Sequence, residues 1–270
     1  MEDIFKPDAF ADKVALITGA TSGLGAETAR QFAAHGASVA LIGRNAERGE
    51  ALKAEIEAAG GTAALILADV SQSATCDKVV ADTVAAFGRV DILFNNAGIV
   101  VTTAMVDTSD EDFERVMRIN LFGSYYMARA SVRQMLKQGS GSIVNMGSDA
   151  GLQGYAGMST YGTTKAAVIH MTKCMALETA DQNIRVNVIC PGDIDTPMQD
   201  AGYGDSDMPR EEMMAAVAST IPMKRHGQPV EIAHTVMYLA SDAAKFLHGT
   251  ICSVDGGAAA GRSFIMDEEA

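Results

Sequence analysis

Three side chains near the middle of the chain have types and spacing suited to acid–base chemistry. Tyr161 and Lys165 are four residues apart, so on a helix they share one face. A free tyrosine has a pKa of about 10, too high for acid–base catalysis at neutral pH, and a nearby ammonium lowers it by favouring the phenolate. A Tyr-x-x-x-Lys pair also arises by chance on helix surfaces. Ser148 strengthens the catalytic interpretation, because it follows an apolar run and its hydroxyl could hydrogen-bond a substrate oxygen.

A glycine-rich segment near the N-terminus has the spacing of a phosphate-binding turn. It lies between the apolar run 14–17 and an amphipathic stretch. Glycines let backbone N–H groups approach a phosphate, and the following helix N-terminus adds donors and partial positive charge. A plain glycine-rich turn is the alternative, but the position between strand and helix favours a nucleotide. The residues expected to bind it are Gly19, Thr21, Ser22, Gly23, Leu24 and Gly25.

The end of the second apolar run, 39–42, bears on which dinucleotide fits. Folds that bind NAD often place a carboxylate here for the ribose 2′-hydroxyl, whereas this chain has Arg44 and Asn45. No carboxylate would repel a 2′-phosphate, and Arg44 could pair with one. NADP(H) is therefore favoured, with NAD(H) as the alternative. Arg44 could instead be a solvated helix-start residue or stack on adenine. Asp69 could accept a hydrogen bond from the adenine amine or cap the next helix.

The elements that would position these residues alternate regularly along the chain. Short apolar runs without polar alternation suit strands covered on both faces, and amphipathic stretches separate them. Strand, helix and strand at this spacing imply right-handed crossovers and a parallel sheet between two helical layers. The sequence thus predicts an α/β fold with a doubly wound, seven-stranded parallel sheet. The expected strands lie at 14–17, 39–42, 64–67, 92–94, 143–146, 186–189 and 250–252, and the expected helices at about 26–35, 46–59, 74–87, 110–137, 161–181 and 229–241.

Taken in order, the motifs resemble those of the short-chain dehydrogenase/reductase family, in its shorter branch. The resemblance covers residues 13–257, nearly the whole chain. It rests on the glycine-rich turn, on residues 95–98 (Asn-Asn-Ala-Gly), on Asn120, on Ser148 with Tyr161 and Lys165, and on the segments 191–196 and 253–257.

That resemblance implies a single-domain Rossmann fold and hydride transfer between a nicotinamide cofactor and an alcohol or ketone carbon. Tyr161 would be the general acid in reduction and the base in oxidation, and Ser148 would polarise the carbonyl. Lys165 would lower the pKa of Tyr161 and hold the nicotinamide ribose, while Asn120 would position a water for proton relay. Besides Tyr161 and Lys165, the other cofactor contacts expected are Asp69, Val70, Asn96, Ala97, Gly98, Pro191, Gly192, Ile194 and Thr196.

Charge narrows the range of partners. The chain has 21 basic and 34 acidic residues, a formal net charge of −13, so nucleic acid and anionic membranes are poor partners. Residues 193–223 break the strand–helix rhythm and are expected to form a lid. Seven acids and one base lie at 193–212, which would disfavour a strongly anionic substrate. The lid methionines could form either an adaptable cover or the buried stripe of short helices: Met198, Met208, Met213, Met214 and Met223.

A neutral secondary alcohol or ketone, such as a sugar, polyol or cyclic alcohol, therefore ranks as the predicted substrate. A 3-oxoacyl thioester on an acidic carrier protein would need a basic docking patch. Arg129 and Arg133 offer only a small one and fit helix packing better. A non-catalytic dinucleotide-binding subunit is a third hypothesis, which the joint presence of serine, tyrosine and lysine opposes. The pocket is expected from residues 99–105, 149–158 and the lid.

Two positions depart from the family pattern. Residues 154–157 lack the proline that often precedes the second glycine of this loop. Asp149 stands where an apolar or small residue is common. It is expected to be an exposed loop acid, with a polar pocket residue as the alternative.

The remaining expectations concern cellular context and assembly. The four cysteines are widely separated and predict free thiols in a reducing cytoplasm, and no histidine pattern supports a metal site. No apolar run could span a membrane, and no signal-peptide pattern is present, so a cytoplasmic protein is expected. The resemblance implies a homotetramer that pairs the helices at 110–137 and 161–181 and the last strands. Phe122, Tyr125, Tyr126 and Met127 could supply that face or belong to the core, and residues 258–270 are expected to form a tail.

Overall fold

The computed structural model describes residues 5–202 and 208–261, and a seven-stranded parallel sheet forms its centre. The strand order is β3-β2-β1-β4-β5-β6-β7, and every neighbouring pair is parallel. This confirms the predicted doubly wound sheet, whose order reverses between β1 and β4. The strands are β1 Val14–Thr18, β2 Ser38–Gly43, β3 Thr62–Leu67, β4 Ile92–Asn95, β5 Gly141–Met146, β6 Ile184–Pro191 and β7 Ile251–Val254.

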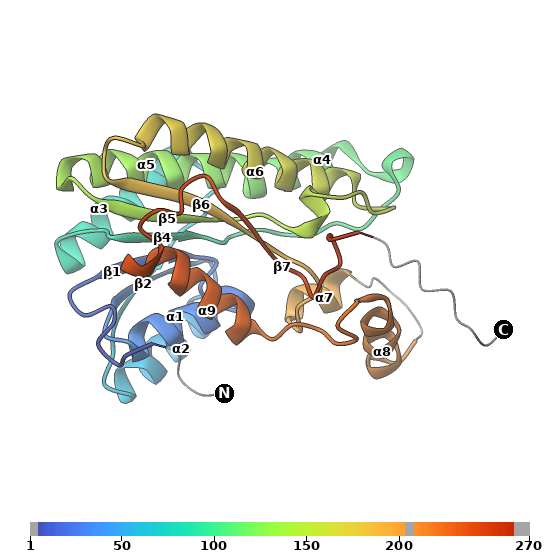
Figure 1. Cartoon of the computed structure of the whole chain (residues 1–270), viewed down its shortest axis with the longest axis horizontal. Coiled ribbons are helices and arrows are strands. Elements are labelled where there is room, and N and C mark those ends of the chain that lie inside the picture. The colour runs from blue at the N-terminus through green and yellow to red at the C-terminus, as the bar shows by residue number, and fades with distance from the viewer. Residues whose placement is uncertain (1–4, 203–207, 262–270) are drawn as a thin grey trace.

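Helices cover both faces of the sheet (Figure 1). On one face lie α1 (Gly23–Ala34), α2 (Ala46–Ala58) and α9 (Pro229–Ala240). On the other lie α3 (Ser73–Phe87), α4 (Asp110–Val116), α5 (Ser124–Gln138) and α6 (Ser159–Thr179). Short 3₁₀ turns complete the connections: η1 (Met105–Asp107), η3 (Asp149–Gly151) and η4 (Asp242–Ala244).

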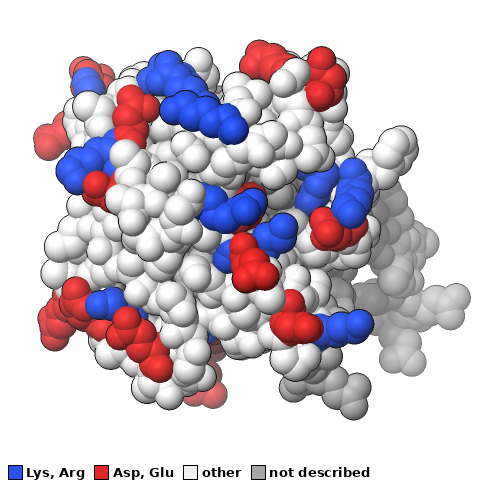
Figure 2. Space-filling model, turned by 90° about the vertical axis from the view of Figure 1, so that its left-hand side faces the viewer, with Lys and Arg blue, Asp and Glu red and all other residues white. Residues whose placement is uncertain are grey.

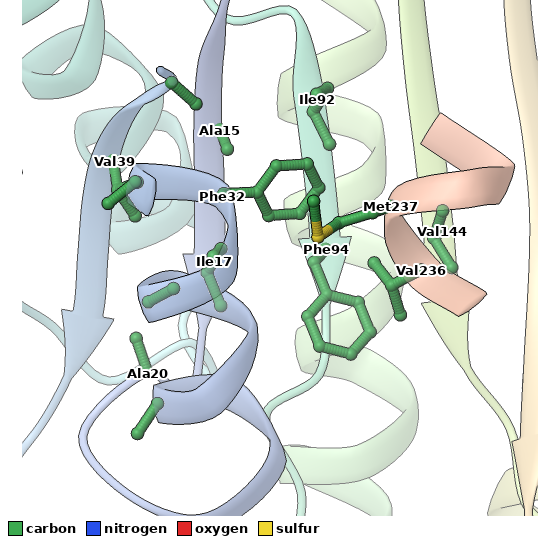
Figure 3. Close-up of a cluster of buried hydrophobic side chains, with 14 of the residues drawn as sticks. Ala15, Ile17, Ala20, Phe32, Val39, Ile92, Phe94, Val144, Val236 and Met237 are labelled. Carbon is green, nitrogen blue, oxygen red and sulfur yellow. The ribbon is translucent and has the colours of Figure 1, made fainter. Parts of the chain in front are cut away.

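Two large apolar cores hold these layers together, one on each face of the sheet, and Ile169, Val188 and Cys190 form a small third cluster. In the first, Phe32 of α1 packs with Ile17, Phe94 and Met237 from two strands and α9 (Figure 3). Leu93 belongs to the second core, because successive strand residues point to opposite faces. Each fully buried side chain of this size contributes about 1.5–3 kcal/mol by leaving water.

The helix expected at 110–137 contains an irregularity at its centre. Between α4 and α5, residues Met117–Gly123 form η2, a π-helical segment. Such segments are rare and often occur at functional sites. The fully buried Asn120 lies within η2, so the sequence predicted the helix but not the widened turn that carries its polar residue.

The lid contains two helices, α7 (Pro197–Gly202) and α8 (Arg210–Thr220), and its only described strand-like contact is the bridge between Ile194 and Gly227. The interpretation of the lid methionines as a buried stripe is wrong, because α8 has no buried residue. Met213 and Met214 of α8 are partly buried. The other lid methionines are exposed: Met198, Met208 and Met223. Two lid acids, Asp205 and Asp207, and residues 262–270 of the expected tail lie outside the described part of the chain.

The helix-packing interpretation of two arginines is confirmed. Arg129 donates from Nη2 to Ser73 Oγ of α3 at 2.8 Å, and Arg133 lies 3.5 Å from Asp77 of the same helix. On the side of the molecule facing away from the lid, basic and acidic residues alternate in small groups on neutral surface (Figure 2). In the described residues, no helix is long and apolar enough to cross a membrane.

Candidate active site

A cavity of about 900 Å³ opens at the carboxyl edge of the sheet and runs from the glycine-rich turn to the lid. This is where ligands bind in doubly wound sheets. Every residue expected to bind cofactor lines it except Gly25, and every expected catalytic residue lines it except Asn120. The structure therefore brings the predicted residues together along one cavity, and the two exceptions lie behind its wall.

The glycine-rich turn has the features that a pyrophosphate requires. Helix α1 begins at Gly23, three residues earlier than expected, so the motif forms its first turn. Ser22 at the N-cap makes no side-chain capping bond, and no acid lies in the first turn, so the terminal N–H groups stay available to an anion. Gly19 has a φ of +66°, which an L side chain rarely adopts. A Cβ at Gly25 would overlap the Gly19 carbonyl, so Gly25 lets the helix pack on the turn. These residues fit a dinucleotide phosphate.

Polar side chains after β4 fasten this turn to the sheet. Thr18 Oγ1 accepts hydrogen bonds from the backbone N–H groups of Asn96 (2.9 Å) and Ala97 (3.0 Å), and Asn96 Nδ2 donates to the Thr18 carbonyl at 2.9 Å. The buried Asn95 donates to Ser124 O (2.7 Å) and to Asn145 Oδ1 (3.0 Å). Residues 95–97 thus link β4 to α5, to β5 and to the phosphate-binding turn.

Two arginines lie at the end of the cavity expected to hold the adenosine. Arg44 and Arg48 are both exposed and both line it, although only Arg44 was predicted. The signal for Arg48 was its position one turn into the helix that Asn45 caps by accepting the Arg48 backbone N–H at 2.9 Å. Asp69 Oδ1 accepts the Ser71 N–H at 3.0 Å and closes a turn. The N-cap of α3 is Gln72, so the capping interpretation of Asp69 is wrong.

The expected catalytic side chains meet at the far end of the cavity. Lys165 Nζ lies 5.5 Å from the centre of the Tyr161 ring and donates to the Met146 carbonyl at 3.0 Å. Ser148 lies two residues beyond the end of β5, where its Oγ accepts the Ala150 N–H at 3.1 Å. Burial raises the pKa of Tyr161 to about 12, opposed by a hydrogen bond with Ser148. Burial lowers the pKa of Lys165 to about 8. The pKa of Tyr161 is thus raised in the structure, whereas a lowering was expected from Lys165.

Asn120 supports this cluster from behind the cavity wall. Its Oδ1 accepts the Ile99 N–H at 2.8 Å, and its Nδ2 donates to the Ile99 carbonyl at 2.8 Å and to Thr164 Oγ1 at 3.3 Å. A Cβ built at Gly98 would be 3.3 Å from Asn120 Oδ1 and 3.6 Å from Lys165 Nζ. Asn120 and Lys165 therefore flank Gly98, and the water that Asn120 would hold stays a prediction.

The expectation that Asp149 is an exposed loop acid is wrong. The η3 turn after Ser148 directs this residue inward, where it is 7% exposed and lines the cavity. Its carboxylate accepts hydrogen bonds from Ser148 Oγ at 3.0 Å and from Tyr155 Oη at 2.6 Å. The alternative, a polar pocket residue, is what the structure contains.

The lid completes the substrate end. Asp193 lines the cavity, accepts a hydrogen bond from Gln199 Nε2 at 3.1 Å, and has its carboxyl pKa raised by burial and by the charge of Asp149. The expected pocket segments contribute Ile99, Val100 and Met158, whereas Met105 is exposed and does not line the cavity. Lining residues without a sequence signal come mainly from strand ends: Ile42, Ala68, Ile119, Met146 and Gly147. Over the described ranges, no three His, Cys, Asp or Glu side chains gather as a metal site.

Comparison with known proteins agrees with this geometry. The family model described as "Enoyl-(Acyl carrier protein) reductase" matches residues 19–259. An uncharacterized oxidoreductase of Thermotoga maritima is 42% identical, over 93% of this chain and 99% of its own length. A 2,5-dichloro-2,5-cyclohexadiene-1,4-diol dehydrogenase of Sphingobium indicum is 39% identical over 92% and 96%. A 3-oxoacyl-[acyl-carrier-protein] reductase of Thermotoga maritima is 38% identical over 91% and 97%.

Solved structures point to the same class. Levodione reductase superposes with a TM-score of 0.90 at 36% identity, covering 94% of this chain and all of that one. Actinorhodin polyketide ketoreductase, solved with NADPH, has a TM-score of 0.87 at 33% identity and covers 92% and 97%. The chain belongs to the short-chain dehydrogenase/reductase family. It is an oxidoreductase of a family that binds a nicotinamide cofactor.

Proposed function

We propose that this oxidoreductase transfers hydride between NADP(H) and a neutral secondary alcohol or ketone, such as a sugar, polyol or cyclic alcohol. The observation that carries the proposal is one continuous cavity with a phosphate-binding turn at one end and Ser148, Tyr161 and Lys165 at the other. When bound, the nicotinamide supplies or accepts the hydride.

The chain's own residues move the proton and orient the substrate. In reduction, the Tyr161 hydroxyl donates its proton to the carbonyl oxygen, and in oxidation the phenolate takes the proton of the alcohol. Ser148 hydrogen-bonds the same substrate oxygen. The Lys165 ammonium stabilises the phenolate and would bind the ribose hydroxyls, while Asn120 would hold a water that returns the proton.

The charge of the substrate end supports a neutral substrate. Two carboxylates, Asp149 and Asp193, line it, and Lys165 is the only lysine or arginine among the described lining residues there. A 3-oxoacyl thioester on an acidic carrier protein would approach an acidic rim. Arg129 and Arg133, the arginines that could bind such a carrier, instead pack against α3. The relatives include both a cyclic diol dehydrogenase and 3-oxoacyl reductases.

Steady-state kinetics test this substrate class directly. We expect kcat/KM for the best of a set of neutral cyclic ketones to exceed that for acetoacetyl-coenzyme A at least tenfold. A preference for the thioester over every neutral ketone would overturn the substrate assignment while leaving the hydride chemistry intact.

The preference for NADP(H) is tested by removing the two arginines at the adenosine end. A charge-assisted hydrogen bond is worth about 1.5–3 kcal/mol, so the double variant Arg44→Ala/Arg48→Ala should weaken NADPH binding by about ten- to a hundredfold. NADH binding should change less than threefold. Arg133→Ala, which removes an exposed arginine that packs on α3, is the matched control. Equal losses for both cofactors in a fluorescence titration would refute a 2′-phosphate contact.

We also propose a homotetramer that uses the outer face of η2 and α5. Phe122 is 40% exposed and Tyr125 is 49% exposed, whereas Met127 is buried, so two of the four residues considered for this face point outward. Phe122→Asp/Tyr125→Asp should lower the mass measured by light scattering from four chains to two or one, because it buries charge at the interface. Val106→Asp, at an exposed apolar residue of η1, should leave the mass unchanged. A wild-type mass of one chain would contradict the proposal.

A further inference from the structure

Asp149 is a buried carboxylate that the proposed catalytic roles do not use. Its two oxygens accept hydrogen bonds from neutral hydroxyls, those of Ser148 and Tyr155. Its side chain is only 7% exposed, and within the described residues it forms no ion pair. Burying a carboxylate without a cationic partner is costly, so its negative charge acts strongly on the groups around it.

The groups that face this carboxylate come from four elements. Tyr155 lies in the loop after η3, Tyr161 on α6, Cys190 on β6 and Asp193 at the start of the lid. Burial raises the pKa of the Cys190 thiol to about 12, so it adds no charge at neutral pH. Burial raises the pKa of Tyr155, Tyr161 and Asp193, and the charge of Asp149 raises each of them further.

The hydrogen bond to Ser148 adds a second effect of the same sign. A serine hydroxyl has one proton, and a proton donated to Asp149 Oδ1 cannot also stabilise a phenolate on Tyr161. Ser148 is the group whose hydrogen bond favours ionisation of Tyr161. Asp149 therefore opposes the phenolate twice, by its charge and by competing for the Ser148 proton.

We propose that Asp149 is a positioning residue that holds the Ser148 hydroxyl and keeps Tyr161 in its protonated, proton-donating form. At neutral pH the site then rests in the protonated form that reduction of a ketone requires. This inference rests on the proposed role of Tyr161 and adds a residue that sets the pH at which each direction operates.

The sign of the pH effect follows from the proton that each direction needs. Reduction requires the protonated tyrosine and is lost as pH rises through its pKa, whereas oxidation requires the phenolate and rises through the same pKa. Asp149→Asn removes the charge and keeps an oxygen that can accept from Ser148. The fall in the reduction rate and the rise in the oxidation rate, the two limbs of the pH profiles, should therefore both move to lower pH by about one unit. Oxidation at a pH below the wild-type limb should become up to about tenfold faster, a gain that lost packing would not produce.

The experiment records kcat/KM against pH in both directions for the wild type, Asp149→Asn and Tyr155→Phe. Tyr155→Phe removes one hydrogen bond to the carboxylate and leaves its charge, so both limbs should keep their positions even where the rate changes. Asp149→Ser is a second neutral variant, which should show the same shift if the asparagine variant folds poorly.

Unmoved limbs in both Asp149 variants, a move to higher pH, or an equal shift in Tyr155→Phe would overturn the inference. Tyr161→Phe is measured alongside. If that variant retains turnover, the proposed function fails. If it is inactive and the Asp149 variants leave the limbs in place, only the inference about Asp149 fails.

Discussion

Replacing Tyr161 with phenylalanine is expected to lower kcat about a thousandfold in both directions, within the range attributed to a positioned general acid or base. Phenylalanine keeps the ring beside Lys165 and removes only the hydroxyl that exchanges the proton. The dissociation constant of NADPH should stay within about twofold, because the phosphate-binding turn lies at the other end of the cavity.

Single-turnover kinetics and a fluorescence titration measure the two quantities separately. Tyr155→Phe is the matched control, because it removes a phenol hydroxyl from the same cavity without removing the proposed proton donor. Turnover above one-tenth of the wild-type rate in Tyr161→Phe would contradict the assigned role. A wild type that binds cofactor without turning over any alcohol or ketone would instead favour the non-catalytic subunit.

Substituting alanine for Gly19 is expected to weaken cofactor binding about thirtyfold. The residue has a φ of +66°, and a Cβ there would lie 2.9 Å from Asn96 Nδ2 and 3.0 Å from Ala97 Cα. The turn must shift, which displaces the N–H groups that would meet the pyrophosphate. A displacement that costs about 2 kcal/mol of binding energy gives this factor.

Gly60→Ala separates this local effect from backbone strain. Gly60 has a φ of +88°, but nothing lies within 4 Å of its Cβ position. Both variants should lose about 1–2 kcal/mol of unfolding free energy from the left-handed conformation, and only Gly19→Ala should lose affinity. Equal affinities of the two variants for NADPH would show that the Gly19 turn does not bind phosphate.

The sheet could be predicted because its signal is local. Each strand is a short apolar run with burial on both faces, as in β1 and β2, so its composition alone identifies it. The Tyr161–Lys165 pair was equally accessible, since helical spacing fixes their common face.

The burial of Asp149 and the π-helical turn at Asn120 could not be predicted from the sequence. The burial of Asp149 depends on the η3 turn and on a partner six residues away, and a carboxylate after a strand otherwise predicts an exposed loop. The π-helical segment around Asn120 has no pattern of apolar residues that would distinguish it from an α-helix in the sequence. The sequence left two interpretations of the lid methionines open for a related reason, because methionines at helical spacing resemble a core stripe whether or not anything covers them.

Isotope labelling shows whether the protein transfers hydride from the nicotinamide to a neutral ketone. NADPH carrying deuterium at the transferable position of the nicotinamide is mixed with the wild-type protein and the best neutral cyclic ketone. We expect one deuterium at the carbinol carbon of the product for each cofactor oxidised, and labelling about a thousandfold slower with Tyr161→Phe. The absence of label from the carbinol carbon for every neutral ketone, with deuterium transferred to a 3-oxoacyl thioester, would contradict this expectation.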